Sequence, residues 1–314
     1  NGNPHISYNQ GTELGYAYKD AGGWHVETAD HSTYVGAESS IALDSNNYPH
    51  ISYYDYYTNE DLKYAYKDAD GWRVETVYSP GDSGRSTSIA LDDSEYPCIC
   101  FSAGNGVYYV YQDGSGWNDI EHVGGGGEPE MVLDADYYPH VAYSHYNVDA
   151  GEQYLKYAYK DGSGWYSEIV LDTGHSVNYP SLALDSNGYP HILYYYLEDP
   201  AYENKLKYAY KDGSGWHVET VNDESGACYT SLEIDSSGYP HAAFHYWGYS
   251  SLKYIYQDGS GWHSETVEDY TDYDIGVGMY PSLVLDTAGN PHISYTYYND
   301  DEGDEDLKYA RFSP

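Results

Sequence analysis

A repeated segment constrains the fold of this chain more than any other feature of its sequence. Copies of a Pro-His-Ile-Ser-Tyr pattern recur through all 314 residues at spacings of 42 to 51 residues. The copies begin at Pro4, Pro49, Pro97, Pro139, Pro190, Pro240 and Pro291. A period of this size, in segments rich in β-forming residues, is typical of the blades of a β-propeller.

Residues 181–221 show how one repeat is built. An apolar strand over 181–185 ends at Asp-Ser-Asn-Gly, a sequence that favours a tight hairpin turn. A second strand follows Pro190, a third is expected over 206–211, and Asp-Gly-Ser-Gly then turns the chain into a fourth at 216–221. The repeat therefore predicts a four-stranded antiparallel meander, with almost no helix in the chain.

The number of strand patterns predicts the number of blades. The first and fourth patterns occur six times, whereas the second and third occur seven times. We therefore predict an all-β fold, a single β-propeller domain over 1–314 with seven four-stranded blades, of which the first and last are incomplete. A six-bladed ring with one redundant hairpin is the alternative. The predicted blades cover residues 1–30, 37–78, 85–124, 129–172, 179–222, 229–268 and 280–312.

The charge of the chain limits its partners. It has 51 acidic and 13 basic residues and a formal net charge of −38. Such a charge repels nucleic acids and anionic membranes and attracts cations, so we expect no nucleic-acid partner. No run of 18 apolar residues exists, so no membrane insertion is expected. The three cysteines, Cys98, Cys100 and Cys228, do not predict a disulfide framework.

Each repeat supplies an Asp, a His, often a Ser and a Trp in the same order, as in Asp44, His50, Ser52 and Trp72. The set resembles the Asp-His-Ser-Trp tetrads that brace the blades of WD-repeat propellers. A histidine repeated in every blade is spread around a ring and cannot converge on one substrate or metal, so we assign these residues a structural role. The predicted network comprises Asp44, His50, Ser52, Trp72, His140, Trp165, His191, Trp216, His241 and His292.

Acidic loops between the second and third strands are the candidate metal sites. Ca²⁺ binds six to eight hard oxygen ligands, which such loops can offer. We therefore expect Ca²⁺ as a cofactor, although solvated loops with diffuse counterions are the alternative. The candidate ligands are Asp55, Glu60, Asp61, Asp199, Asp300, Asp301, Asp304 and Asp306.

Short catalytic motifs do not occur in this sequence. The turn Asp161-Gly-Ser-Gly-Trp165 resembles the Asp-box hairpin of sialidase-like propellers, which is a folding device in that family. The three arginines, Arg73, Arg85 and Arg311, are dispersed, and no Ser-His-Asp or metalloprotease motif is present. From these observations we predict that the chain is not an enzyme.

The consensus S-L-A-L-D-S-N-G-Y-P-H-I-S-Y, followed by L-K-Y-A-Y-K-D-G-S-G-W-H-V-E-T-V, resembles a tandem repeat of large secreted or surface proteins of bacteria and archaea. This resemblance implies a propeller and an extracellular or cell-surface location. A chain that begins inside a repeat also suggests that an upstream segment was lost, which fits secretion.

Open blade edges invite pairing with another chain. We therefore predict a non-catalytic extracellular structural protein that self-associates into a filament or tube, with copies of itself as partners. The alternative is a carbohydrate-binding propeller that uses its 45 tyrosines and its tryptophans to bind glycans. A glycoside hydrolase of sialidase-like fold is a distant third.

Overall fold

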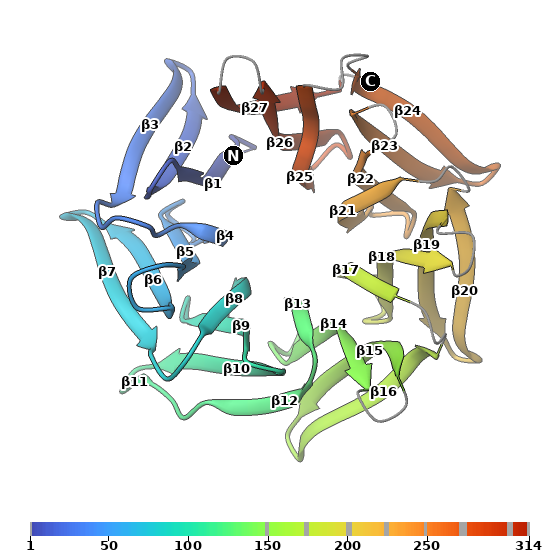
Figure 1. Ribbon diagram of the computed structural model, residues 1–314, viewed down its shortest axis with the longest axis horizontal. Coiled ribbons are helices and arrows are strands. Elements are labelled where there is room, and N and C mark those ends of the chain that lie inside the picture. Colours follow the sequence, from blue (N-terminus) through green and yellow to red (C-terminus); the bar gives the residue numbers. More distant parts are fainter. Residues whose placement is uncertain are drawn as a thin grey trace. The chain divides into compact units, whose positions relative to one another are not determined.

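The computed structural model describes residues 2–147, 151–172, 176–198, 203–222, 226–247, 250–269, 275–299 and 304–312. All regular structure in these ranges is β-strand, arranged in seven antiparallel sheets. The predicted all-β, seven-bladed β-propeller fold is confirmed, with three strands in the first and last blades (Figure 1). The alternative of six blades with a redundant hairpin is wrong. Within these ranges no helix long and apolar enough to cross a membrane occurs.

The chain beyond its first two residues forms two compact units, residues 3–146 with 156–168 and residues 147–155 with 169–314. The first three blades comprise β1 His5–Gln10, β2 Glu13–Asp20 and β3 Gly23–Asp30; β4 Ala37–Leu43, β5 Pro49–Asp55, β6 Asp61–Asp68 and β7 Gly71–Tyr78; and β8 Ser83–Leu91, β9 Pro97–Ala103, β10 Gly106–Asp113, β11 Gly116–Trp117 and β12 Glu121–Gly125. The fourth comprises β13 Gly127–Leu133, β14 Pro139–Asn147, β15 Glu152–Asp161 and β16 Gly164–Asp172. The last three comprise β17 Ser176–Leu184, β18 Pro190–Glu198, β19 Glu203–Asp212 and β20 Gly215–Asn222; β21 Ala227–Ile234, β22 Pro240–Tyr246, β23 Ser251–Asp258 and β24 Gly261–Asp269; and β25 Ile275–Leu285, β26 Pro291–Asn299 and β27 Asp304–Arg311.

Aspartates at fixed positions shape the two tight turns of each repeat. Asp44 Oδ1 accepts hydrogen bonds from the backbone N–H of Asn46 at 2.9 Å and of Tyr48 at 2.7 Å, closing the turn between the first and second strands. Asp161 Oδ1 accepts the N–H of Ser163 at 2.7 Å in the turn before the fourth strand. These contacts lie within a few residues of each other, so the turns follow directly from local sequence.

The core lies between adjacent sheets and is built largely from the second and third strands. Between the first two blades, Leu14 and Tyr16 pack against Ile51 and Tyr53 in one buried cluster. Between the fifth and sixth blades, the same strand positions form an equivalent cluster. Because both faces of these strands are covered, they consist of nearly continuous apolar and tyrosine residues rather than an alternating pattern.

The first strand of each blade from the second to the seventh contains a β-bulge. At the bulge one residue adopts a positive φ of 48° to 53°, and the pairing with the second strand shifts register. The six bulge residues are Glu38, Ser86, Glu128, Tyr179, Tyr229 and Tyr280. A bulge turns a side chain away from the direction that a regular strand would give it. The fold therefore presents a glutamate, serine or tyrosine side chain at the same distorted position of each of these blades.

Candidate functional site

The repeated histidines lie inside their own blades. The Nδ1 atom of His50 is 2.5 Å from the hydroxyl oxygen of Tyr64 on the adjacent strand, and His241 makes the same contact with Tyr254 at 2.5 Å. His140 and His191 form the equivalent hydrogen bonds with Tyr157 and Tyr208, and His292 with Tyr309 at 2.6 Å. Burial lowers the pKa of the imidazoles of His50, His140, His191 and His241, which favours their neutral form.

Ser52 and the tryptophans of the predicted network make separate contacts. Ser52 Oγ lies 2.7 Å from Thr87 Oγ1 of the next blade. Glu27 of the first blade accepts hydrogen bonds from Trp72 Nε1 at 2.9 Å and from Lys67 Nζ at 2.6 Å. The structure therefore distributes Asp44, His50, Ser52 and Trp72 among different contacts and does not join them in one chain of hydrogen bonds.

The carboxylate partner of the repeated tryptophan escaped the sequence analysis. Trp165 Nε1 donates to Glu121 at 2.7 Å and Lys160 Nζ lies 2.6 Å from the same carboxylate, while Trp117 donates to Glu75 at 2.9 Å. The partners come from strands about forty residues away, and the only local signal is the Trp-x-x-Glu spacing of several fourth strands. Trp72, Trp165 and Trp216 are half-buried, with Lys211 Nζ 5.6 Å from the centroid of the Trp216 ring.

The structure describes only part of the predicted calcium set. Asp55 and Asp61 are buried and lie opposite each other on β5 and β6, where Asp55 accepts from Asn59 Nδ2 at 2.9 Å and Asp61 from Ser79 Oγ at 2.7 Å. Glu60 and Asp306 are exposed. Asp199, Asp300, Asp301 and the side chain of Asp304 lie outside the described residues. Among the described residues no group of three or more metal-binding side chains occurs, and the calcium cofactor stays a prediction.

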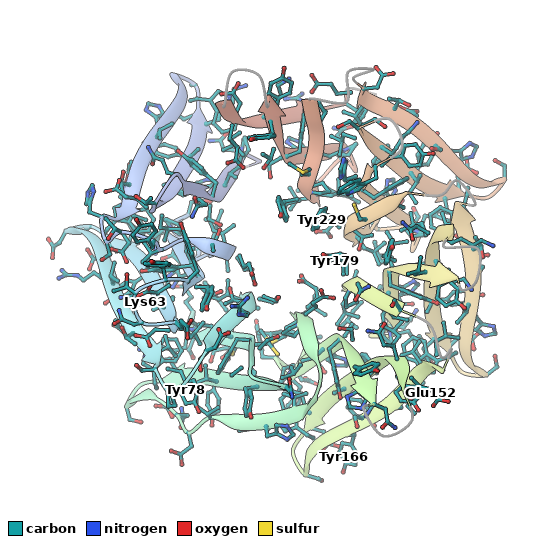
Figure 2. All side chains as sticks on the ribbon, viewed as in Figure 1. Lys63, Tyr78, Glu152, Tyr166, Tyr179 and Tyr229 are labelled. Atoms are coloured by element: carbon teal, nitrogen blue, oxygen red, sulfur yellow. The ribbon has the colours of Figure 1, made fainter. Side chains whose placement is uncertain are left out.

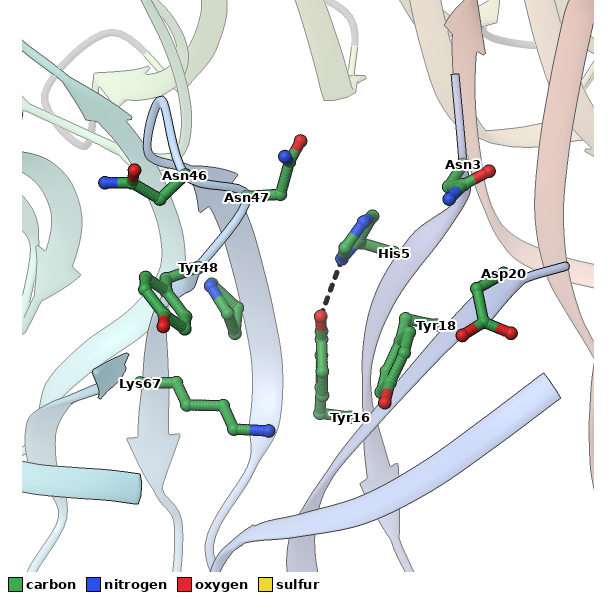
Figure 3. A pocket seen from close by; sticks show the side chains of 10 residues that line it. Asn3, His5, Tyr16, Tyr18, Asp20, Asn46, Asn47, Tyr48 and Lys67 are labelled. Carbon is green, nitrogen blue, oxygen red and sulfur yellow. Dashed lines mark hydrogen bonds between the residues drawn. The ribbon is translucent and has the colours of Figure 1, made fainter. Parts of the chain in front are cut away.

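A pocket of about 320 Å³ lies between the first two blades, beside the turn that precedes β5 (Figure 3). Most of the polar groups in its wall belong to the repeated structural contacts. His5 Nδ1 is 2.6 Å from the Tyr16 hydroxyl, Asp20 lies 2.9 Å from His25, and Lys67 pairs with Glu27. The pocket therefore does not gather groups that are free for chemistry.

A row of three tyrosines in the second unit forms a partly exposed aromatic surface. Tyr179, Tyr229 and Tyr280 occupy the bulge positions of β17, β21 and β25, and Figure 2 shows Tyr179 and Tyr229 beside each other on these strands. Ring centroids lie 4.6 Å apart for Tyr179 and Tyr229 and 4.4 Å apart for Tyr229 and Tyr280. Tyr280 is 62% exposed and Tyr179 is 37% exposed. We call these three residues the tyrosine row.

The backbone holds the tyrosine row in a conformation that tyrosine rarely adopts. A positive φ is an outlier for a bulky side chain and costs on the order of 1–3 kcal/mol. Neighbouring strands stabilise it, since Thr230 Oγ1 donates to the carbonyl of Tyr179 at 2.7 Å. Contacts between blades therefore hold the backbone of the row in this conformation, so little backbone ordering is needed when a ligand binds.

The sequence analysis did not single out the tyrosine row, although a signal for it exists. The bulge position varies between repeats, with Glu38, Ser86 and Glu128 in the first unit where the second unit has tyrosine. A surface side chain that varies at a position of constant backbone geometry is a candidate for ligand recognition. The repeat therefore offers an internal comparison that could have identified this position.

A Cys-His pair next to the tyrosine row has no features of a nucleophile. Cys228 Sγ lies 3.5 Å from His245 Nδ1, and both side chains are buried. Burial raises the pKa of the Cys228 thiol to about 12 and lowers the pKa of His245 to about 4. Both groups are therefore neutral at physiological pH, whereas a catalytic cysteine needs its thiolate form.

No protein-family model matches the chain, and no curated protein matches its sequence. Solved structures match its fold. A protein of unknown function from Dyadobacter fermentans is 11% identical, with a TM-score of 0.64, and the match covers 98% of this chain and 97% of that one. An ulvan lyase, a polysaccharide lyase bound to -[GlcA(1-4)Rha3S]-, is 11% identical with a TM-score of 0.59 and coverage of 98% and 91%. An α-L-arabinanase from Penicillium chrysogenum, complexed with arabinobiose, is 11% identical with a TM-score of 0.60 and coverage of 87% and 92%.

These comparisons show the fold and correct two predictions. The predictions of a non-catalytic structural protein and of no enzyme activity are contradicted, because the matched propellers include carbohydrate-cleaving enzymes. The absence of a short catalytic motif does not exclude an enzyme, because a propeller site can combine side chains from several blades and leave no local pattern. The resemblance to a surface-protein repeat is supported only as far as the β-propeller fold. The extracellular location and the association with copies of itself stay predictions.

Proposed function

We propose that this protein is a carbohydrate-active propeller that holds a glycan against the tyrosine row. The observation that carries this proposal is the contiguous set of three aromatic rings on the first strands of successive blades, with Tyr179 and Tyr280 exposed and Tyr229 half-buried between them. The flat C–H face of a sugar packs on an aromatic ring, and a tyrosine hydroxyl can both donate a hydrogen bond and accept one. Tyrosine suits this surface better than phenylalanine because its polar end stays in water.

The comparisons support a carbohydrate ligand without identifying one. The ulvan lyase and the arabinanase act on polysaccharides of different chemistry, so the shared fold accommodates several substrates. The tyrosine row supplies a binding surface that is common to such substrates, since each sugar ring has a face that can stack. We expect binding at the tyrosine row to position the polysaccharide for cleavage.

Glycan binding tests the proposal directly. In affinity electrophoresis through gels that contain arabinan, xylan, glucan or ulvan, at least one polymer should retard the protein. The Y229A and Y280A variants should each weaken binding about tenfold, as expected for the loss of a stacking platform of on the order of 1–3 kcal/mol. Assays for new reducing ends and for unsaturated products on the same polymers distinguish hydrolysis from elimination.

Two control variants separate stacking from general effects. Y280F keeps the stacking ring and loses only the hydroxyl, so it should bind more tightly than Y280A. Tyr57 is 73% exposed and belongs to the first unit, whereas the tyrosine row belongs to the second, so Y57A should bind normally. If no polymer retards the natural protein, or if Y229A and Y280A bind as tightly as Y57A, the proposed function is wrong.

A further inference from the structure

Trp247 departs from the pattern of the other tryptophans. Of the seven in the chain, the six others each open a fourth strand, and four of these donate their Nε1 to a glutamate of the preceding blade. Trp247 instead follows the second strand β22 and is 71% exposed. Its backbone is anchored, because its N–H donates to the carbonyl of Gly226 at 2.8 Å. An exposed indole carries weight as a ligand contact only where it is continuous with other aromatic surface.

A continuous aromatic path connects Trp247 to the tyrosine row. The ring of His245 lies 6.4 Å from Tyr229, nearly parallel to it at 17°, and 6.4 Å from Trp247. His245 is 3% exposed, whereas the indole of Trp247 projects into solvent. The imidazole therefore forms a buried floor between two accessible rings. The aromatic surface therefore extends beyond the tyrosine row to Trp247.

The chemistry of this path is uncharged. His245 is neutral because burial lowers its pKa to about 4, and the Cys228 thiol beside it is also neutral. The chain as a whole carries a net charge of −38, which repels a polymer of uronic acids or sulfated sugars. A neutral polysaccharide avoids this repulsion and still offers sugar faces to the rings.

Resting on the proposed function, we infer that the bound glycan is a neutral polymer chain that runs from the tyrosine row over His245 to an outer subsite formed by Trp247. Such a ligand must be long enough to reach both ends of the path. A disaccharide on the tyrosine row leaves Trp247 uncovered, whereas a hexasaccharide contacts it. Affinity should therefore increase with chain length, and that increase should depend on Trp247.

The test compares short and long ligands on matched variants. Isothermal titration with the di- and hexasaccharides of arabinan, xylan and glucan is carried out on the natural protein, W247A, Y229A and the Y57A control. We expect W247A to bind the hexasaccharide about fivefold or more weakly while its disaccharide affinity stays within about twofold. Y229A should lose affinity for both lengths. Thermal melting of each variant confirms that it is folded.

The outcomes separate the two proposals. If Y229A weakens binding but W247A binds the hexasaccharide normally, or loses both lengths equally, the outer subsite is wrong and the proposed function stands. If ulvan or alginate binds and no neutral polymer does, the neutral ligand is wrong. If W247A changes only the association of the protein with its own copies in sedimentation, Trp247 is a protein contact and the inference is overturned. If no glycan binds at all, both proposals fail.

Discussion

Glu233 occupies a position that small apolar residues fill in the other blades. Glu233 on β21 pairs with His241 on β22. In the other blades, the first-strand residue that pairs with the same position of the second strand is Ala42, Ala90, Val132, Ala183 or Val284. Burial raises the pKa of the Glu233 carboxyl from 4.5 to about 7. The Glu233 carboxyl therefore destabilises the folded state at any pH at which it ionises in the unfolded chain but stays protonated in the folded one.

The E233Q variant tests this residue-scale effect. Because the folded pKa is raised, the stability associated with Glu233 is complete below pH 4.5 and is lost as the pH rises to about 7. A shift of this size corresponds to at most about 3 kcal/mol. We expect E233Q to unfold at a higher urea concentration than the natural protein at pH 8, with the difference shrinking towards pH 5. A difference that is the same at both pH values would contradict the raised pKa.

At the scale of single elements, glycine lets the first strand of a blade approach the blade before it. Gly84 on β8 has a φ of 101°, and a Cβ atom there would lie 2.6 Å from the Cα of Leu62 on β6. Gly278 on β25 approaches Leu252 in the same way, at 2.7 Å. Both glycines come two residues before a bulge. The close approach of the glycine to the preceding blade and the bulge that follows it together determine the position of the bulge side chain.

The G84A variant should therefore lose stability through both backbone strain and a backbone clash. We expect a loss of at least about 2 kcal/mol, measured by urea unfolding, since a positive φ alone costs on the order of 1–3 kcal/mol for a residue with a Cβ. G213A is the matched control, because Gly213 has no positive φ and nothing within 4 Å of an added Cβ. Equal stability of the two variants would show that the strand can move away without cost.

At the scale of the whole molecule, the buried histidines make stability depend on pH. Burial lowers the pKa of His50, His140, His191 and His241 below 6.5. The unfolded chain therefore takes up protons near pH 6.5 that the folded chain does not bind. Stability is complete above this pH and is lost as the pH falls towards the folded pKa values, by about 1.4 kcal/mol per pH unit for each proton.

Thermal melting between pH 8 and pH 5 checks this prediction. The melting temperature should fall below pH 6.5, because several histidines act together and outweigh the opposite effect of the single Glu233 carboxyl. Replacing one histidine, as in H50N, removes one of these protons. The slope of stability against pH should then be smaller by up to about 1.4 kcal/mol per pH unit. A melting temperature that rises on acidification would rule out the histidines as the dominant groups.

The repeat by itself determined the fold class and the number of blades. These features follow from interactions over a few residues, such as the turn held by Asp44 and the hairpin glycines, which recur in most copies of the repeat. The structural location of the histidines could also be inferred, because a residue that recurs once per blade cannot converge on one site.

Only the tertiary structure decided which of the 45 tyrosines could bind a ligand. Tyr53 on the second strand β5 is fully buried, whereas Tyr280 on the first strand β25 is 62% exposed. The difference arises from strand register, from the bulge and from the packing of the neighbouring blade, none of which is visible in a local pattern. The pairing of Trp72 with Glu27 across two blades was hidden for the same reason. Local turns set the architecture, but contacts between residues about fifty positions apart decide which rings face solvent.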